Sequence, residues 1–322
     1  MRIDCQTHLF PPWYLEYLER RQEEPRVIRK GGERFVVLGG WGGRLLPKLY
    51  DVKEKLRAMD EAGVDLGILS INNPGPELLG EDGPRVASRM NDFIAEQVAA
   101  HPDRFVGLAI LPVQDAKTSL LELERCVSDL RMRGILLYSN VAGKPIDAPS
   151  LRPLYQRVEE LGIPICLHPT HPVMEAVTRD YEMVAMVGFM FDTSIAMLRL
   201  ILSGILEAHP RLKVVLPHLG GTIPYLMGRI DHQTEVLRRG RENIRKAPST
   251  YFSRVYLDTV SPLPLAIQYG YDFAGPDRLL FGSDHPWLDV QPFVRMVEDL
   301  PIPEEDKRKI FSENARSLFG IT

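Results

Sequence analysis

The 322-residue sequence predicts an α/β protein, a (β/α)8 barrel of the TIM type with a lid-like insertion after its first strand. Eight short apolar runs recur along the chain, and segments with helical periodicity separate most of them. The runs lack strict alternation of apolar and polar residues, which is typical of parallel strands covered on both faces. We expect strands at 1–6, 65–71, 105–111, 134–138, 163–167, 213–216, 255–258 and 278–282.

Helical periodicity predicts the elements that connect these strands. The expected helices are 52–62, 83–100, 117–130, 150–161, 192–208 and 224–237. Gly63 and Gly162 follow two of them and supply plausible stop signals. Alternating β and α units in this number favour a closed barrel, with an open doubly wound sheet as the alternative.

Residues 9–50 do not fit the alternation, because they separate the first strand from its helix. The segment contains two prolines, Pro11 and Pro12, and a glycine-rich run at 39–43. Loops of this length are uncommon in compact domains unless they are functional. A segment that follows the first strand emerges on the rim that carries active sites. We therefore expect one domain over 1–322, with 9–50 as a lid or small subdomain; a peripheral embellishment is the alternative.

Composition points to a soluble, cytoplasmic protein without a nucleic-acid or membrane partner. The formal net charge of −4 gives no reason to invoke either partner. No apolar stretch in the sequence approaches the ~20 residues of a membrane helix, and the N-terminus lacks the pattern of a signal peptide. Cys5, Cys126 and Cys166 are too widely spaced to imply a disulfide framework. We expect Cys5 to be a buried packing residue.

Four polar side chains follow expected strands and therefore share one rim of the barrel. His8, His168 and His218 each lie at or just past the C-terminal end of a strand, and Asp284 follows the last strand. A lone histidine is more often a hydrogen-bonded core residue, but four such groups on one rim favour a site. Imidazole and carboxylate suit a divalent transition metal. A structural zinc site is disfavoured, because no clustered cysteine and histidine spacing exists.

The other histidines have weaker signals. His101 and His209 follow helical segments, where a histidine favours the helix dipole, and we expect them to be structural. His232 lies within a helical segment and is expected at the surface or in an interface. His171 and His285 lie near stronger candidates, so support of the site, substrate contact and simple loop placement stay open for both.

A set of short motifs, in their order and spacing, resembles the amidohydrolase superfamily. Within it, the chain is similar to the branch of aminocarboxymuconate-semialdehyde decarboxylase and related aromatic-acid decarboxylases and hydrolases. Each motif alone is weak, and together they run nearly end to end. They lie at 104–109, 111–112, 124–127, 168–169, 210–214, 218–221, 282–284 and 314–315.

The resemblance implies roles for the rim residues. This branch holds one divalent metal through an N-terminal HxH pair, a histidine after strand five and an aspartate after strand eight. Here that implies His8, His168 and Asp284 as metal ligands. It also implies His218 as the catalytic acid/base, with Asp284 able to shuttle a proton. Arg229 stands at the spacing of an arginine that binds the substrate carboxylate across a homodimer interface; a surface salt bridge is the alternative.

Gln6 departs from the pattern, because it occupies the position of the first histidine in the HxH pair. Its amide oxygen is a neutral and weaker ligand that shifts preference from zinc toward manganese or magnesium, if it binds the metal at all. A second interpretation leaves three protein ligands plus water. In a third, the metal is lost and the other residues contact substrate directly.

The resemblance implies a metal-dependent, non-oxidative decarboxylase of a small aromatic or muconate-like carboxylic acid. The cofactor it implies is one divalent ion, zinc in the first place and manganese as the alternative. A hydrolase of a C–C bond, lactone or amide on the same barrel is the second function, because the same residues serve both reactions. An inactive binding protein that lost its metal at Gln6 is the third.

Overall fold

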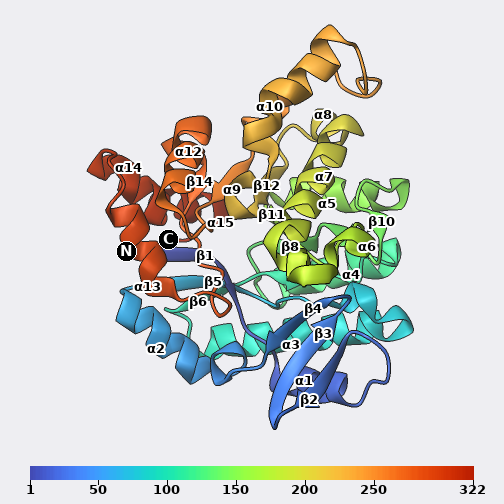
Figure 1. The fold of residues 1–322 in the computed structure, drawn as a ribbon, viewed down its shortest axis with the longest axis vertical. Helices are drawn as coiled ribbons and strands as arrows, with labels where there is room; N and C mark the ends of the chain where they lie inside the picture. Colours follow the sequence, from blue (N-terminus) through green and yellow to red (C-terminus); the bar gives the residue numbers. More distant parts are fainter.

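The computed structural model describes residues 1–322, and eight parallel strands form a closed barrel at its centre (Figure 1). All eight expected strands are confirmed, the third of them as two pieces. They are β1 (Ile3–His8), β5 (Leu66–Ser70), β6 (Phe105–Gly107) with β7 (Ala109–Ile110), β8 (Ile135–Tyr138), β11 (Pro164–His168), β12 (Lys213–Leu216), β13 (Tyr256–Asp258) and β14 (Leu279–Leu280).

Backbone hydrogen bonds close the barrel at two places where the ladders are interrupted. At Leu108, the N–H donates to the Leu69 carbonyl, and the next N–H donates to Gly134 in the following strand. At the seam between the chain ends, Cys5 N–H donates to Phe281 O, and His8 N–H donates to His285 O. The first and last strands are therefore neighbours, as the barrel prediction requires.

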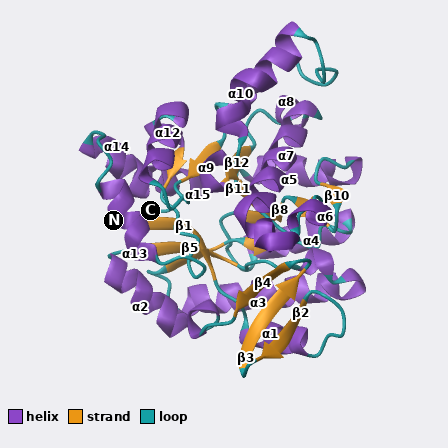
Figure 2. Ribbon diagram, in the orientation of Figure 1, coloured by secondary structure: helices purple, strands orange, loops and turns teal.

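Helices surround the strands (Figure 2), and each of the six expected helices is present. They correspond to α2 (Val52–Ala62), α3 (Gly83–Ala100), α4 (Ala116–Ser128), α5 (Arg152–Leu161), α7 (Phe189–Leu202) with α8 (Ile205–Ala208), and α10 (Ile223–Asp231). Gly63 and Gly162 adopt left-handed φ values of 65° and 69° at the ends of α2 and α5, which confirms them as stop signals.

Further helices were not predicted from the sequence. They are α6 (Glu175–Thr178), α9 (Pro217–Gly220), α11 (Pro248–Phe252), α12 (Pro264–Ala274), α13 (Val290–Glu298), α14 (Glu304–Arg308) and α15 (Asn314–Phe319). The missed α13 carries a clear helical pattern, because Val290, Phe293, Val294 and Val297 are all buried.

The apolar core lies in two places. A cluster of 67 buried residues fills the space between strands and helices. A smaller cluster of 11 residues lies among the strands, where Ile3, Cys5 and Cys166 meet Leu318 and Phe319 of α15. Cys5 is thus a packing residue, as predicted.

Residues 9–50 form a compact unit with secondary structure of its own (Figure 1). It contains α1 (Pro12–Glu19) and an antiparallel sheet of β2 (Arg26–Lys30), β3 (Glu33–Leu38) and β4 (Trp41–Arg44). The Trp41 ring lies 5.2 Å from the Trp287 ring, centroid to centroid, and 6.3 Å from that of Phe189. A small antiparallel pair, β9 (Asn140–Val141) and β10 (Lys144–Pro145), follows β8. Use of the 9–50 segment as a lid stays a prediction.

The expectation that no apolar stretch approaches the length of a membrane helix was wrong for one segment. Helical residues Asp180–Leu202 are long and apolar enough to cross a membrane, by length and composition only. Half of this segment is buried inside the fold. In α7 the buried face includes Met197, Leu200 and Ile201, which pack into the core.

Candidate active site

A β-bulge in β1 decides which side chains face the site. Ile3 and Asp4 pair with Leu66 and Gly67, whereas Thr7 and His8 pair with Leu69 and Ser70, so β1 holds one extra residue between Asp4 and Thr7. An extra residue exchanges the two faces of a strand. At the N-terminal side of the bulge, Cys5 points inward and packs among the strands. At its C-terminal side the inward residues are Gln6 and His8, which approach Asp284.

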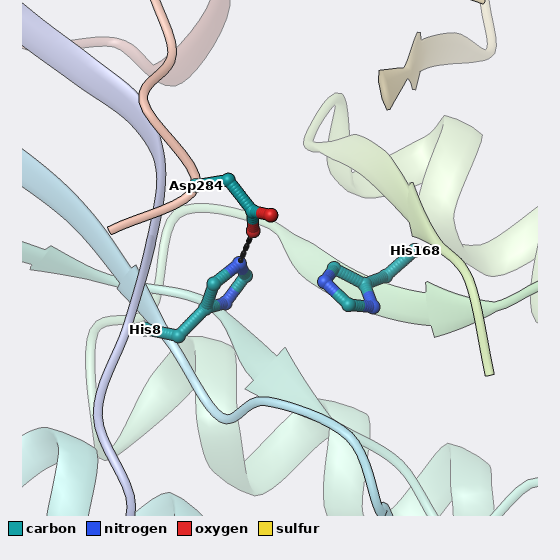
Figure 3. A group of neighbouring side chains, drawn as sticks. All are labelled: His8, His168 and Asp284. Carbon is teal, nitrogen blue, oxygen red and sulfur yellow. Dashed lines mark ion pairs between the residues drawn. The ribbon is translucent and has the colours of Figure 1, made fainter. Parts of the chain in front are cut away.

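The ligand atoms of His8, His168 and Asp284 all lie within 4.8 Å of one another (Figure 3). His8 Nε2 is 3.2 Å from Asp284 Oδ1, and the two imidazole rings meet edge to face with centroids 4.8 Å apart. These are the three metal ligands expected from the sequence, and the barrel brings them together from β1, β11 and the segment after β14.

The two histidines present bare Nε2 atoms to this group. His168 Nδ1 is 2.7 Å from the Pro169 carbonyl, to which it must donate, and His8 Nδ1 is 2.8 Å from Ser70 Oγ. The Nε2 atoms of both rings are buried and make no hydrogen bond, although His8 Nε2 lies 3.2 Å from the Asp284 carboxylate. Unpaired buried nitrogens cost free energy in a folded protein, and a metal ion would satisfy both.

The charges of the group fit a divalent cation. Burial lowers the pKa of His8, and it lowers that of His168 to about 3, so both rings are neutral. Burial alone would raise the pKa of Asp284, but the adjacent His218 and His8 imidazoles outweigh it and hold this pKa well below its usual range. Two neutral imidazoles and one carboxylate can hold one divalent metal ion.

His218 stands beside this group at the end of β12. Its N–H donates to Asp258 Oδ1 at 2.8 Å, which anchors the backbone, and its Nε2 is 3.9 Å from Asp284 Oδ2. Burial lowers the pKa of His218, but the negative charge of the nearby Asp284 carboxylate, helped by Asp258, raises it more, and the net shift is upward. His218 and Asp284 both adopt left-handed φ values, 55° and 60°, which are uncommon for such residues and typical of functional positions.

Gln6 also reaches the group. Its Nε2 donates to Asp284 Oδ1 at 3.4 Å, while its Oε1 is buried and accepts no hydrogen bond. The amide therefore carries a free acceptor oxygen beside Asp284, and all three interpretations of Gln6 stay open.

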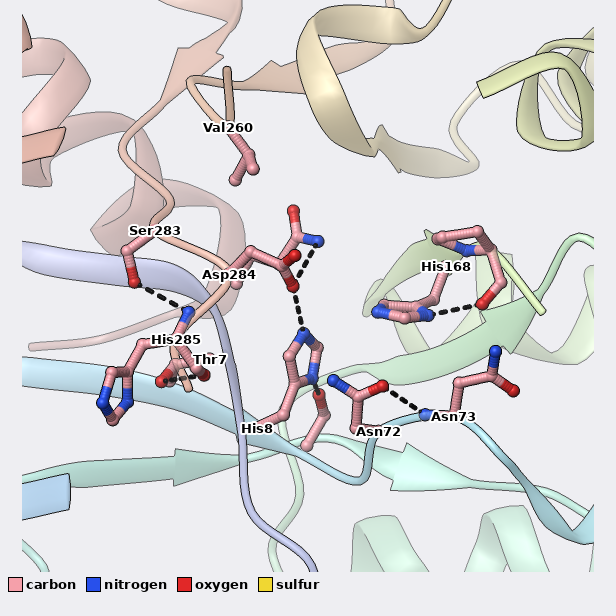
Figure 4. Close-up of polar contacts among 12 residues, drawn as sticks. Thr7, His8, Asn72, Asn73, His168, Val260, Ser283, Asp284 and His285 are labelled. Carbon is pink, nitrogen blue, oxygen red and sulfur yellow. Dashed lines mark hydrogen bonds and ion pairs between the residues drawn. The ribbon is translucent and has the colours of Figure 1, made fainter. Parts of the chain in front are cut away.

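The two ambiguous histidines lie outside the group. Figure 4 shows His285 directed away from Asp284, and its Nδ1 lies 2.8 Å from Lys55 Nζ. His171 pairs with Glu175 at 3.4 Å. His209 pairs with Glu159, while His101 ends α3 and His232 is exposed at the end of α10.

Arg229 does not enter the cavity of its own chain. It lies on α10 with its side chain exposed, and it is absent from the residues that line the cavity. Tyr225, one helical turn earlier on the same face, does line it. The structure thus places Arg229 beside the mouth rather than at the metal group.

A cavity of about 740 Å³ opens above His168, His218 and Asp284. Twelve of its 22 lining residues are hydrophobic, and none is Lys or Arg, so its walls suit an apolar ring but offer no cation. Several lining residues were not predicted from the sequence, notably Asn72, Asn73, Trp41, Phe189 and Trp287. Asn72 and Asn73 directly follow β5, and their position at a strand end was the available signal.

Fold and site together define a class, the (β/α)8 enzymes whose rim carries ligands for one divalent metal. Within that class the chain belongs to the amidohydrolase family, whose model, described as "Amidohydrolase", matches residues 3–321. This finding confirms the family resemblance.

Named relatives place the chain near decarboxylases. It is 33% identical over 303 residues to a gamma-resorcylate decarboxylase of Rhizobium radiobacter, covering 88% of this chain and 92% of that one. It is 29% identical over 333 residues to a 2-amino-3-carboxymuconate-6-semialdehyde decarboxylase of Dictyostelium discoideum, covering 100% and 92%. A dihydroxybenzoic acid decarboxylase of Polaromonas sp., solved with manganese and the inhibitor 2-nitroresorcinol, superposes with a TM-score of 0.83 at 29% identity, covering 99% and 96%.

Proposed function

We propose that this protein is a metal-dependent, non-oxidative decarboxylase of a small aromatic carboxylic acid. The observation that carries the proposal is the pair of bare, buried Nε2 atoms of His8 and His168, which face Asp284 at the base of a largely apolar cavity. The naming of similar proteins as aromatic-acid decarboxylases supports the reaction.

His8, His168 and Asp284 would hold the metal, with Gln6 Oε1 as a fourth, neutral ligand or replaced by water. When bound, the divalent ion supplies positive charge for the substrate's carboxylate and adjacent oxygen. We propose zinc as the metal, with manganese as the alternative supported by the manganese in the Polaromonas enzyme.

His218 and Asp284 would handle the proton. In decarboxylation the bond from ring carbon to carboxyl carbon breaks, the electron pair stays on the ring carbon, and a proton replaces the departing carbon dioxide. His218 lines the cavity, and Asp284 raises its pKa, so the pair can hold a proton and deliver it there.

Apolar walls would bind the ring and exclude water. Trp41, Phe189 and Trp287 contribute aromatic faces from three different segments. Since Trp41 belongs to residues 9–50, we propose that this segment acts as the lid over the ring.

We propose that the working unit is a cytoplasmic homodimer. Large apolar side chains are exposed in the segments that line the cavity and in their immediate neighbours, which is typical of an interface. They include Met186, Val187, Phe191 and Ile195 near and on α7, Tyr225 on α10, and Leu263, Leu265 and Tyr269 near and on α12. No Lys or Arg side chain lines the cavity, and an exposed Arg229 from the second copy would supply a guanidinium for the substrate carboxylate.

Two measurements test the proposal. Metal content is determined on protein purified without chelator, and the same protein is incubated with gamma-resorcylate, other hydroxybenzoates and 2-amino-3-carboxymuconate-6-semialdehyde. Mass loss equal to carbon dioxide supports the decarboxylase. Mass gain equal to water indicates the hydrolase instead. Absence of bound metal, with no rescue by zinc or manganese, contradicts both metal-dependent functions.

A further inference from the structure

Glu77 is a buried carboxyl with no role in the proposed chemistry. It lies in the turn Pro76–Leu78 after β5, and it is only 2% exposed. Its Oε1 is 2.8 Å from Thr170 Oγ1, and its Oε2 has no hydrogen-bond partner. The titratable groups that face it are the phenols of Tyr14 on α1 and Tyr138 on β8, and no cation compensates its charge.

Thr170 links Glu77 to the cavity. Thr170 Oγ1 is also 3.1 Å from Asn73 Oδ1, and Asn73 lines the cavity together with His168. Figure 4 shows Asn73 below His168 at the edge of the site. One hydroxyl carries one proton and cannot donate to two oxygens at once. If the Glu77 carboxyl carries a proton, it donates to Thr170 Oγ1, and the Thr170 hydroxyl then donates to Asn73 Oδ1.

We propose that Glu77 is a positioning residue, a neutral carboxylic acid that donates to Thr170, which in turn donates to Asn73 Oδ1. This chain directs the amide N–H₂ of Asn73 into the cavity, where it donates a hydrogen bond to an anionic oxygen of the ligand. The identity of that ligand rests on the proposed function, whereas the protonation of Glu77 does not.

The charge state of Glu77 sets the polarity that Asn73 presents. Burial raises the pKa of Glu77 to about 8, so the neutral acid prevails at neutral pH. An ionised Glu77 would only accept, and Thr170 would then have to accept from Asn73 Nδ2. That arrangement turns Asn73 Oδ1 toward the cavity, where it repels an anion.

The first test needs no substrate. Melting temperatures of wild type and Glu77→Gln are compared from about pH 5 to about pH 9. Since the folded-state pKa of Glu77 lies above its unfolded value of about 4.3, wild type loses stability as pH rises toward about 8, and the uncharged Gln does not. We expect the melting temperature of Glu77→Gln minus that of wild type to rise by several degrees between about pH 5 and about pH 8. Above about pH 8 this difference should stay constant. A difference that does not change with pH overturns the neutral acid.

The second test measures the affinity of the metal-loaded protein for gamma-resorcylate, which depends on the orientation of the Asn73 amide. Glu77→Leu and Thr170→Val remove the chain and should weaken binding about tenfold or more, as expected for a hydrogen bond to a charged group. The matched variants Glu77→Gln and Thr170→Ser keep the donors and should restore it. In wild type binding should weaken above about pH 8, and in Glu77→Gln it should not.

Equal binding by Glu77→Leu and Glu77→Gln overturns the positioning role. Should gamma-resorcylate bind neither wild type nor any variant, this acid is not a ligand of the site, while the melting experiment still decides the state of Glu77.

Discussion

The segments 4–8 and 283–285 each send polar side chains in two directions, and the two resulting groups differ in how completely they are paired. One group, which we call the anchor, consists of Asp4, Thr7, Ser283, His285 and Lys55 of α2. The other consists of Gln6, His8 and Asp284, which meet His168 and His218 at the cavity.

The anchor is closed. Ser283 Oγ donates to Asp4 Oδ2 at 2.5 Å, and Ser283 N–H donates to Asp4 Oδ1 at 3.0 Å. Lys55, fully buried, donates to Thr7 Oγ1 at 2.7 Å and lies 2.8 Å from His285 Nδ1. Burial lowers the pKa of Lys55 and raises that of Asp4, and their mutual attraction opposes both shifts.

The cavity group is open, because Gln6 Oε1, His8 Nε2, His168 Nε2 and His218 Nδ1 are all buried without partners. Buried polar groups in folded proteins are nearly always paired, so a cluster of unpaired ones is typical of a ligand-binding site. Residue type does not distinguish the two groups, since both contain histidine and aspartate. The completeness of pairing does, and it predicts that the anchor serves stability and the cavity group serves chemistry.

The largest expected effect lies in the cavity group. His218→Asn should lower turnover by roughly 10²–10⁴-fold, the usual contribution of a general acid or base, and should leave metal content unchanged. Turnover and metal analysis on the same preparation check both statements. The control is His232→Asn, a change at an exposed histidine. A wild-type rate in His218→Asn would remove this residue from the reaction.

The matching change in the anchor should act on stability. Lys55→Met leaves Thr7 and His285 without a donor and Asp4 without a cation that favours its charge. We expect the free energy of unfolding to fall by about 3–5 kcal/mol, as when one partner of a buried ionic group is removed. Lys53→Met, on the exposed side of the same helix, should change it by less than about 0.5 kcal/mol. Similar losses in the free energy of unfolding for Lys55→Met and Lys53→Met would contradict the role of the anchor in stability.

The sequence predicted much of this arrangement. The eight strands and the meeting of His8, His168 and Asp284 follow from strand-end positions, because parallel strands of a barrel share one rim. The split into two groups did not follow. It depends on one extra residue in β1, which exchanges the faces above Cys5, and a single sequence does not reveal a bulge.

Other features could not be predicted from the sequence for a different reason. The chain from Glu77 through Thr170 to Asn73 joins loops after two strands, and its members are 93 and 97 residues apart in sequence from Thr170. Hydrogen bonds across such separations depend on loop conformations that local patterns do not encode. The 9–50 segment was expected as a lid or subdomain, yet its three-stranded sheet was not foreseen.

A smaller effect should decide whether Gln6, a member of the cavity group, is a metal ligand. Gln6→Glu adds a charged oxygen beside Asp284 and should raise metal affinity about tenfold or more, because charge count tunes affinity. Competition with a metal chelator measures it for zinc and manganese. Gln6→Leu is the control: weaker metal binding identifies the amide as a ligand, and unchanged binding identifies water in its place.

The smallest effect should come from one hydrogen bond of the anchor. Thr7→Val keeps the shape of the side chain and removes the hydroxyl that accepts from Lys55. We expect a loss of about 1–2 kcal/mol in the free energy of unfolding, because a buried donor loses one partner, and no change in metal affinity. Thr7→Ser retains the hydroxyl and serves as the control. In the double variant with Lys55→Met, the Thr7→Val loss should be smaller than in wild type, since the hydrogen bond to Lys55 is already absent and only the one from Thr7 to the His285 carbonyl is still lost. A loss of metal affinity in Thr7→Val would mean that the anchor and the cavity group act as one unit.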